Sequence, residues 1–294
     1  MSKAQAIFAA ALAGAVLTTA APALAAQCEA KGGFNAFIGA FKKEAASQGI
    51  SQRGLAALDG LTLDPQVIAA DRRQHVFKQS FEEFSARMIS RDRLIKGAGH
   101  MQRYAPMLRR MEQRYGVPAA VVIAVWGLET DYGVNQGKYP VVRSVATLAY
   151  DCRRSDKFQG ELLDALRIVD RGDMTAAEMH GQWAGEIGQT QFLPSSYYKY
   201  AVDFDGDGRR DLIHSAPDVL ASTANYFHAH GWQPGQGWEP GQPNFDVIKE
   251  WNKADVYART IALFAEKLAS GAPRAESAPP RQQTPEQVAR RIRR

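Results

Sequence analysis

This chain of 294 residues has only two cysteines, no internal repeat and no convincing alternation of apolar and polar residues. The missing alternation argues against a mainly β fold. The apolar stretch near the N-terminus, residues 7–17, is too short and too rich in Ala and Gly for a good membrane span, which needs about 20 apolar residues. Apolar residues recur instead at helical spacing, so we expect a mainly α-helical chain without a transmembrane segment.

Residues 1–26 have the pattern of a secretory signal peptide. Lys3 supplies the positive charge, residues 7–17 the apolar region, and the Ala-Leu-Ala of residues 23–25 the small-residue cleavage pattern. We therefore expect an exported, periplasmic protein that is soluble after removal of the signal.

The two cysteines, Cys28 and Cys152, follow this predicted export signal. Cys28 suggests a lipid attachment site, but Gln27 before it is not the small residue that such sites usually need. In an oxidising compartment the two thiols could pair and tie the new N-terminus to the body of the protein. The alternative of two unpaired thiols stays open.

Positive charge is concentrated at the C-terminal end. The formal net charge is +5, of which Lys3 supplies one and residues 272–294 supply four, so residues 27–271 are close to neutral. Together with export, this neutrality argues against nucleic-acid binding. The basic tail, residues 272–294, is rich in Pro, Gln and Ala, which predicts disorder. It could attach the protein weakly to anionic envelope polymers or serve only as a solubilising end.

Residues 27–271 are sufficient for one large core or two tightly fused lobes. Helical spacing and capping residues predict helices within this region at residues 34–48, 155–171, 215–227 and 255–270, and a capping box at Thr175 and Glu178. The Gly/Pro/Trp-rich residues 231–243 are predicted to be a loop.

Glu129 ends a run of eleven uncharged residues, 118–128, and is followed by Thr-Asp-Tyr-Gly. Such a run predicts a helix buried on all sides, with Pro118 in the first turn and Gly133 closing the last. A carboxyl group that loses water without gaining a cation has a raised pKa, which suits a general acid. The alternative is a structural carboxylate paired with Arg153 or Arg154.

Residues 203–209 reproduce the first seven positions of an EF-hand calcium loop. Asp203, Asp205 and Asp207 occupy positions 1, 3 and 5, a glycine follows at position 6, and the carbonyl of Arg209 stands at position 7. Position 12 is His214 in place of the usual Glu, which predicts weak Ca²⁺ binding, with a Kd on the order of 10⁻⁴ to 10⁻³ M. The alternative is a plain Asp/Gly turn.

Four motifs together resemble the B-type lytic murein transglycosylases. They are GLETDYG (127–133), GQWAGEIGQTQFLPSSYYKYAVDFDGDGRRD (181–211), ANYFHAHGW (224–232) and NFDVIKEWNKADVYA (244–258). The resemblance extends from about residue 34 to residue 268. It implies a lysozyme-like catalytic core at residues 116–232, fused to a helical N-terminal lobe at 27–115, with residues 233–271 closing the cleft.

The resemblance also implies a reaction on peptidoglycan. In the family the residue at Glu129 is the only catalytic carboxylate: it protonates the glycosidic oxygen between N-acetylmuramic acid and N-acetylglucosamine. It then accepts the proton of the muramoyl 6-hydroxyl, which closes onto C1 and gives a 1,6-anhydro end. The nearest candidate for a second carboxylate in the sequence, Asp131, stands two positions away and does not share a helix face with Glu129.

Further site residues follow from the same resemblance. The resemblance implies that amide and aromatic side chains line the cleft, namely Gln191, Tyr226, Trp251, Asn252 and Tyr257. It also implies that Arg153 and Arg154 could bind carboxylates of the substrate and that Asp218 completes the metal site of the acidic loop. Gln182 stands where many relatives have a Ser. Tyr226 and Tyr257 could instead be core residues, the arginines surface ion-pair partners, and Asp218 a helix cap.

The sequence therefore predicts a peptidoglycan lytic transglycosylase that needs no cofactor for catalysis and holds Ca²⁺, if at all, as a structural ion. Two alternatives stay open. One is a hydrolytic muramidase that uses the same Glu with water. The other is a non-catalytic peptidoglycan-binding protein, which the intact Glu129 disfavours.

Overall fold

A computed structural model describes residues 26–73 and 79–271. The predicted basic tail and all of the predicted signal except Ala26 lie outside these residues. The described chain is mainly helical, as predicted, and its two short strands, β1 (Tyr139–Pro140) and β2 (His180–Gly181), pair antiparallel. None of the described helices has both the length and the apolar character that crossing a bilayer requires.

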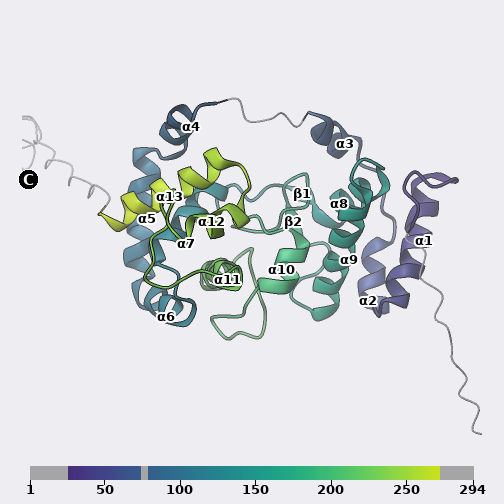
Figure 1. The fold of residues 1–294 in the computed structure, drawn as a ribbon. Helices are drawn as coiled ribbons and strands as arrows, with labels where there is room; N and C mark the ends of the chain where they lie inside the picture. The colour runs from purple at the N-terminus through teal and green to yellow at the C-terminus, as the bar shows by residue number, and fades with distance from the viewer. Residues whose placement is uncertain (1–25, 74–78, 272–294) are drawn as a thin grey trace, which may run out of the picture.

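The helices gather at two ends of the molecule (Figure 1). One end contains α1 (Gly33–Ser47), α2 (Gln52–Leu55), η1 (Ala56–Leu58), α3 (Pro65–Arg72), α8 (Val141–Tyr150) and α9 (Ser155–Arg171). The other contains α4 (Phe81–Met88), α5 (Arg91–Arg103), α6 (Ala105–Tyr115), α7 (Ala119–Thr130), α11 (Ala216–Ala229), α12 (Phe245–Trp251) and α13 (Asp255–Ala269). Between them lie the strands and α10 (Pro194–Tyr200), which packs on α9 and α11.

The N-terminal region does not gather into one body. Helix α2 packs on α9, whereas α5 packs on α7 and α6 on α11. Residues 27–115, which the sequence analysis assigned to one helical lobe, therefore divide between the two ends (Figure 1).

Helix α7 is the buried helix that the uncharged run predicts. Apart from Ala119 and Glu129, all of its residues are buried, and it packs along α13. The helix ends earlier than predicted, because Asp131 (φ 52°) and Tyr132 (φ 64°) already adopt the left-handed conformation. Gly127 lacks a Cβ where one would come within 2.8 Å of the Tyr132 ring, so this glycine allows the reversed chain to pack back on α7.

The N-terminal segment is tied to α9. Cys28 and Cys152 form a disulfide, which the sequence analysis had left open. Ala26 is buried: its N–H donates to a carboxylate oxygen of Glu44 at 2.9 Å, and its carbonyl accepts a 2.9 Å hydrogen bond from Gln159. These contacts hold the segment before α1 against the body of the protein.

The predicted capping box has a different role in the structure. The N–H of Thr175 donates to the Glu178 carboxylate at 2.7 Å, and the N–H of Glu178 donates to the Thr175 hydroxyl at 3.2 Å. No helix begins here among the described residues; the pair closes a turn before β2. The same reciprocal bonds satisfy main-chain donors in a turn as well as in a helix, so the motif alone did not distinguish the two.

Candidate active site

Glu129 lies at the end of α7, facing the last two helices of the described chain. The indole N–H of Trp251 donates to its Oε1 at 2.8 Å, and the hydroxyl of Tyr257 donates to the same oxygen at 2.9 Å. Burial raises the pKa of Glu129 to about 7, although the two hydrogen bonds act to lower it, and the negative charge of Glu186 contributes to the rise. The group can therefore hold a proton near neutral pH and release it there.

The arginines named as alternative partners of Glu129 are engaged elsewhere. Arg153 and Arg154 both form ion pairs with the buried carboxylate of Asp71, Arg153 at 2.8 Å, and Arg72 pairs with it at 3.0 Å. Glu129 has no ion-pair partner among the described residues. The alternative of a structural salt bridge at Glu129 is therefore wrong.

Asp131 also points away from the acid. Its carboxylate pairs with Arg93 at 3.3 Å and with Lys96 at 3.1 Å, both on α5. Because its charge is satisfied there, Asp131 is not a second carboxylate for chemistry at Glu129.

Glu129 lines an open cleft of about 630 Å³ between the two ends of the molecule. Six other residues selected from the sequence line the same cleft: Arg154, Gln182, Gln191, Tyr226, Trp251 and Asn252. Tyr257 lies behind the acid and donates to it. Arg153 is not among the residues that line this cleft, and its guanidinium faces Asp71.

Aromatic rings form one wall of the cleft. The Trp251 ring lies 5.3 Å from the ring of Phe192 and 5.0 Å from that of Tyr226, measured between centroids. Tyr226 is 9% exposed and donates its hydroxyl to the carbonyl of Glu250 at 2.8 Å. It is thus both a packed core residue and part of the wall, and the two alternatives for this position are compatible.

The three amide side chains of the cleft differ in how firmly hydrogen bonds hold them. Gln191, at a φ of 57°, donates to the carbonyls of Gly188 and Gln136 at 2.7 and 3.1 Å. Asn252 accepts a hydrogen bond from the N–H of Ala254 at 3.0 Å. Among the described residues, the side chain of Gln182 makes a single long contact, 3.5 Å to the carbonyl of Asn135. Gln191 is therefore the most firmly oriented of the three.

Thr130, directly after the acid, connects α7 to the loop opposite. Its hydroxyl donates to the carbonyl of Gln189 at 2.5 Å and accepts from the N–H of Gly133 at 2.8 Å. The side chain of Gln189 in turn accepts from the indole of Trp126 at 2.8 Å. These bonds fix the position of Glu129 relative to the loop that carries Gln191.

The sequence analysis missed a second carboxyl group in the cleft. Glu186, within the motif GQWAGEIGQ, lines the cleft together with Lys157. Burial raises the pKa of Glu186, while nearby main-chain N–H groups and the charges of Lys157 and Arg154 act against the rise. Glu186 is far from Glu129 in the sequence, whereas Asp131 is its near neighbour, so sequence spacing pointed to Asp131. The local signal for Glu186 was an acid inside an otherwise apolar Ala-Gly-x-Ile-Gly stretch.

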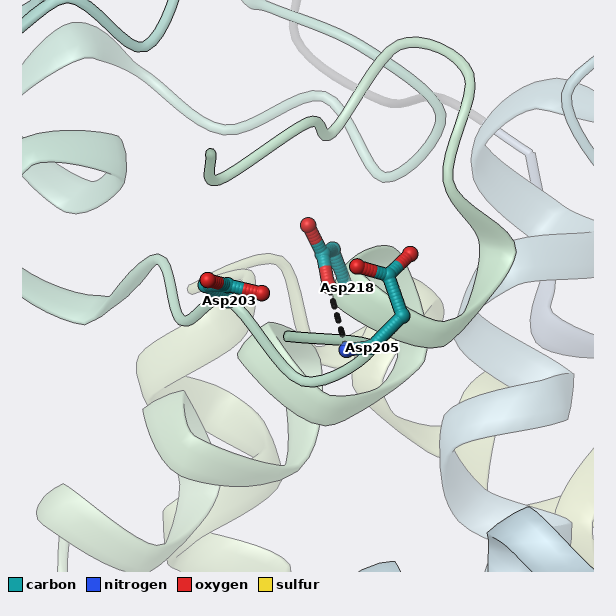
Figure 2. A group of neighbouring side chains, drawn as sticks. All are labelled: Asp203, Asp205 and Asp218. Atoms are coloured by element: carbon teal, nitrogen blue, oxygen red, sulfur yellow. Dashed lines mark hydrogen bonds between the residues drawn. The ribbon is translucent and has the colours of Figure 1, made fainter. Parts of the chain in front are cut away.

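The acidic loop gathers three of the predicted metal ligands (Figure 2). Asp203, Asp205 and Asp218 each place a carboxylate oxygen so that the three lie within 4.8 Å of one another. Burial raises the pKa of Asp218, and the charge of Asp205 contributes to the rise. Three clustered carboxylates suit a hard cation such as Ca²⁺, which binds preferentially to oxygen ligands.

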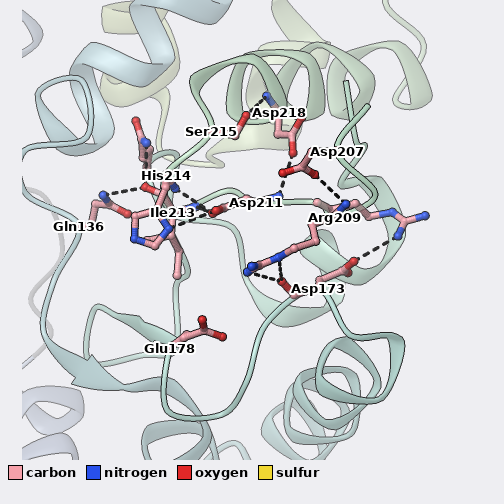
Figure 3. A network of polar contacts seen from close by, with 12 residues as sticks. Gln136, Asp173, Glu178, Asp207, Arg209, Asp211, Ile213, His214, Ser215 and Asp218 are labelled. Carbon is pink, nitrogen blue, oxygen red and sulfur yellow. Dashed lines mark hydrogen bonds and ion pairs between the residues drawn. The ribbon is translucent and has the colours of Figure 1, made fainter. Parts of the chain in front are cut away.

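Asp207 and Arg209 are not part of this three-carboxylate cluster. Asp207 accepts a 2.8 Å bond from the N–H of Arg209, whose guanidinium donates to the carbonyl of Asp173 (Figure 3). His214, at the twelfth position, contacts Asp211 at 3.1 Å. Asp218 also accepts from the N–H groups of Phe204 and Asp211 at 2.7 and 2.9 Å, so it organises the loop as well as facing its centre.

Residues 33–242 match the protein family described as Transglycosylase SLT domain, so this chain belongs to that family. The prediction made from the four motifs is thereby confirmed. A stretch of 153 residues is 37% identical to the membrane-bound lytic murein transglycosylase B of Escherichia coli (strain K12). It covers 52% of this chain but only 42% of that protein, so the match spans less than half of this relative.

Several solved structures resemble most of this chain, and two of them bear on the site. SltB3 from Pseudomonas aeruginosa, in complex with NAG-anhNAM-pentapeptide, is 32% identical, with a TM-score of 0.76 over 82% of this chain and 80% of that chain. The Escherichia coli lytic transglycosylase SLT35, in complex with calcium, is 26% identical, with a TM-score of 0.71 over 79% of this chain and 92% of that chain. The predicted mainly helical, lysozyme-like fold is confirmed by these likenesses.

Proposed function

We propose that this protein is a peptidoglycan lytic transglycosylase that cleaves the β-1,4 bond between N-acetylmuramic acid and N-acetylglucosamine. The observation that carries the proposal is Glu129, a carboxyl group with a pKa of about 7 that lines a cleft of about 630 Å³. Family membership supports the reaction class, and SltB3 was solved with a saccharide that contains an anhydro-muramoyl unit.

The proposed reaction uses Glu129 twice. Its carboxyl group first donates a proton to the glycosidic oxygen, and the bond from that oxygen to C1 of the muramoyl unit breaks. The resulting carboxylate then accepts the proton of the muramoyl 6-hydroxyl as its oxygen bonds to C1, which yields the 1,6-anhydro end without water. Trp251 and Tyr257 hold Oε1, and their hydrogen bonds stabilise the carboxylate between the two steps.

The cleft walls suit a sugar chain. The Trp251 and Tyr226 rings offer apolar surface to sugar faces, while Gln191 and Asn252 offer amide groups for N-acetyl and hydroxyl groups. Arg154 lines the same cleft beside Lys157, where carboxylates of the lactyl group or of a peptide stem would find positive charge. Arg153 supports this arrangement indirectly, through the carboxylate of Asp71 that it shares with Arg154.

The calcium proposal rests on the acidic loop. Asp203, Asp205 and Asp218 would hold the ion, with support from the relative solved with calcium. The cation would offset the repulsion among three carboxylates and so stabilise the loop between α10 and α11. The site would be structural, since the reaction at Glu129 needs no cofactor.

The proposed location of the protein and its attachment to the envelope depend on the N-terminal signal and the basic tail, most of which lies outside the described residues. We expect export through the N-terminal signal and a periplasmic location. Any attachment by the basic residues 272–294 to anionic polymers should weaken with salt, because exposed charges are screened beyond about 8 Å at physiological ionic strength. This attachment is tested by pelleting with sacculi, across a salt series, the full-length protein and a protein truncated after residue 271. If the two proteins pellet to the same extent, residues 272–294 are not an anchor.

Glu129→Gln tests the assignment of the acid. Gln is nearly isosteric but neither donates nor accepts the required proton, so release of anhydromuropeptides from purified sacculi should fall at least about 10³-fold, while co-pelleting with sacculi is retained. Glu112→Gln, at an exposed position on α6, makes the same change in net charge away from the cleft and should release at the wild-type rate. Wild-type release by a folded Glu129→Gln protein would contradict the assignment.

A further inference from the structure

Asp71 is a buried carboxylate that no step of the proposed reaction uses. It lies near the end of α3 with 1% of its side chain exposed, and three arginines contact it. Arg153 pairs with its Oδ2 at 2.8 Å, Arg72 pairs with the same oxygen at 3.0 Å, and Arg154 pairs with Oδ1. A buried carboxylate needs a cationic partner, but one partner is sufficient to balance its charge. The arrangement therefore indicates that Asp71 holds the arginines as much as they hold Asp71.

The inner sides of Arg153 and Arg154 are fixed by several contacts. Besides its ion pair, Arg153 donates to the main-chain carbonyl of Asp71 at 2.8 Å. The guanidinium of Arg154 lies 4.9 Å from the ring centroid of Phe158, a buried residue of α9. A mobile arginine loses conformational entropy when it binds a ligand, and these contacts remove that loss in advance.

The outer sides of the same arginines remain open to solvent. Exposed fractions are 43% for the side chain of Arg153 and 28% for that of Arg154, which lines the catalytic cleft. A second space of about 300 Å³, the side hollow, lies beside the disulfide and is lined by both arginines and by Lys157. Arg154 and Lys157 belong to the side hollow and to the cleft. Three cations against one acid, Asp156, give the side hollow a positive charge that a ligand can reach.

We propose that Asp71 is a positioning residue, which holds Arg153 and Arg154 so that their outer sides bind carboxylates of the stem peptide on the muramoyl unit. The inference rests on the proposed function. A strand whose muramoyl unit is bound at Glu129 brings its stem peptide to the edge of the cleft. Guanidinium groups that are already oriented bind a carboxylate more tightly than mobile ones. Asp71 thereby gives the protein a preference for strands with charged stem peptides.

Asp71→Asn tests the proposal on two soluble glycans. One carries native stem peptides, and the other is the same glycan after its carboxylates have been converted to amides. Asn is nearly isosteric but lacks the charge that holds the arginines. KM for the charged glycan should therefore rise about tenfold with little change in kcat, as expected for one hydrogen bond to a charged group. Both constants for the amidated glycan should equal those of the wild type.

Asp164→Asn is the matched control. It breaks an ion pair with Arg167 on α9, and Asp164 lines neither the cleft nor the side hollow. This variant should match the wild type on both glycans. Release of anhydromuropeptides is the readout for every variant.

Arg154→Ala makes the test independent of whether Asp71→Asn folds, because Asp71 keeps Arg72 and Arg153 as partners. It should show the same rise in KM for the charged glycan, and adding Asp71→Asn to it should raise KM by less than Asp71→Asn does alone.

Two results would overturn the proposal. One is an Asp71→Asn protein that loses kcat equally on both glycans, as a purely structural role predicts. The other is an Arg154→Ala protein whose KM for the charged glycan is unchanged, since there would then be no binding for Asp71 to support. If the wild type released no anhydro product from either glycan, the proposed function itself would fail, which is a different result from both.

Discussion

The hydroxyl of Tyr257 donates to Oε1 of Glu129 at 2.9 Å, across 128 positions of the sequence. Burial, followed by the charge of Glu129 and the hydrogen bond itself, raises the pKa of Tyr257 well above its ordinary value, so the phenol remains the donor. Trp251 donates to the same oxygen at 2.8 Å. Two donors on one oxygen leave Oε2 of the acid for the substrate, because no described residue donates to it.

Tyr257→Phe should move the alkaline limb of activity to higher pH. The hydrogen bond from Tyr257 lowers the pKa of Glu129, which stands at about 7, so removing the bond raises that pKa. The protonated acid then persists to higher pH, although kcat falls because the carboxylate loses a donor that fixes its orientation. The pH dependence of kcat/KM measures the shift, and a midpoint that stays in place or falls would contradict this role for Tyr257.

Glu129→Gln should stabilise the protein at alkaline pH relative to the wild type. The folded-state pKa of Glu129, about 7, lies above its ordinary value of 4.5, so the folded state is favoured when the group is protonated. That contribution is complete below about pH 4.5 and is lost as pH rises through 7. Gln does not titrate, so the stability difference should grow between pH 5 and pH 8, to at most about 3 kcal/mol.

Urea unfolding of both proteins at pH 5 and pH 8 measures this difference. Glu112→Gln, which makes the same change in net charge at an exposed position on α6, is the control. A Glu129→Gln protein whose stability parallels that of the wild type at both pH values would show that the carboxyl group is not desolvated in the folded state.

The sequence predicted helix α7 and its acid well because both depend on neighbouring residues: an uncharged run forms a buried helix and places Glu129 at its end. It placed the end of that helix two residues too late, since Asp131 tolerates the left-handed conformation that was assigned to Gly133. Helix boundaries depend on side-chain packing, here of Tyr132 against Gly127, which sequence spacing does not reveal.

Contacts between site residues that lie far apart in the sequence were harder to predict. The resemblance to a family brought Gln191, Tyr226 and Trp251 into the predicted site, and all line the cleft with Glu129. The carboxylate of Asp71, which holds Arg153 and Arg154, was not predicted, because those residues lie 82 and 83 positions away in the sequence. Nothing in the neighbouring sequence indicates that an Asp on a helix, such as Asp71 on α3, is buried.

Calcium should raise the melting temperature of the protein. An ion that binds only the folded state stabilises it by roughly 1.4 kcal/mol at a concentration ten times its Kd. Asp205→Asn removes a carboxylate of the three-residue cluster and should abolish the response, while Asp207→Asn, outside the cluster, should retain most of it. Melting curves that are the same in millimolar Ca²⁺ and in chelator would favour a plain turn.

Replacing both Cys28 and Cys152 by Ala should destabilise the protein by a few kcal/mol, in the range of about 2–5 kcal/mol typical of native disulfides. The bridge closes a segment of 124 residues, and its loss also releases the contacts of Ala26 with Glu44 and Gln159. Chemical unfolding of the double variant and of reduced wild type should agree. A double variant as stable as the oxidised wild type would show that the bridge adds nothing.

The most direct test of the central claim is mass spectrometry of the fragments released from purified sacculi by the wild-type protein. If Glu129 acts as acid and then as base on the muramoyl 6-hydroxyl, the fragments carry 1,6-anhydromuramoyl ends and incorporate no ¹⁸O when the digestion is run in H₂¹⁸O. Reducing muramoyl ends labelled with ¹⁸O would instead show that water attacks C1, and the protein would be a hydrolytic muramidase.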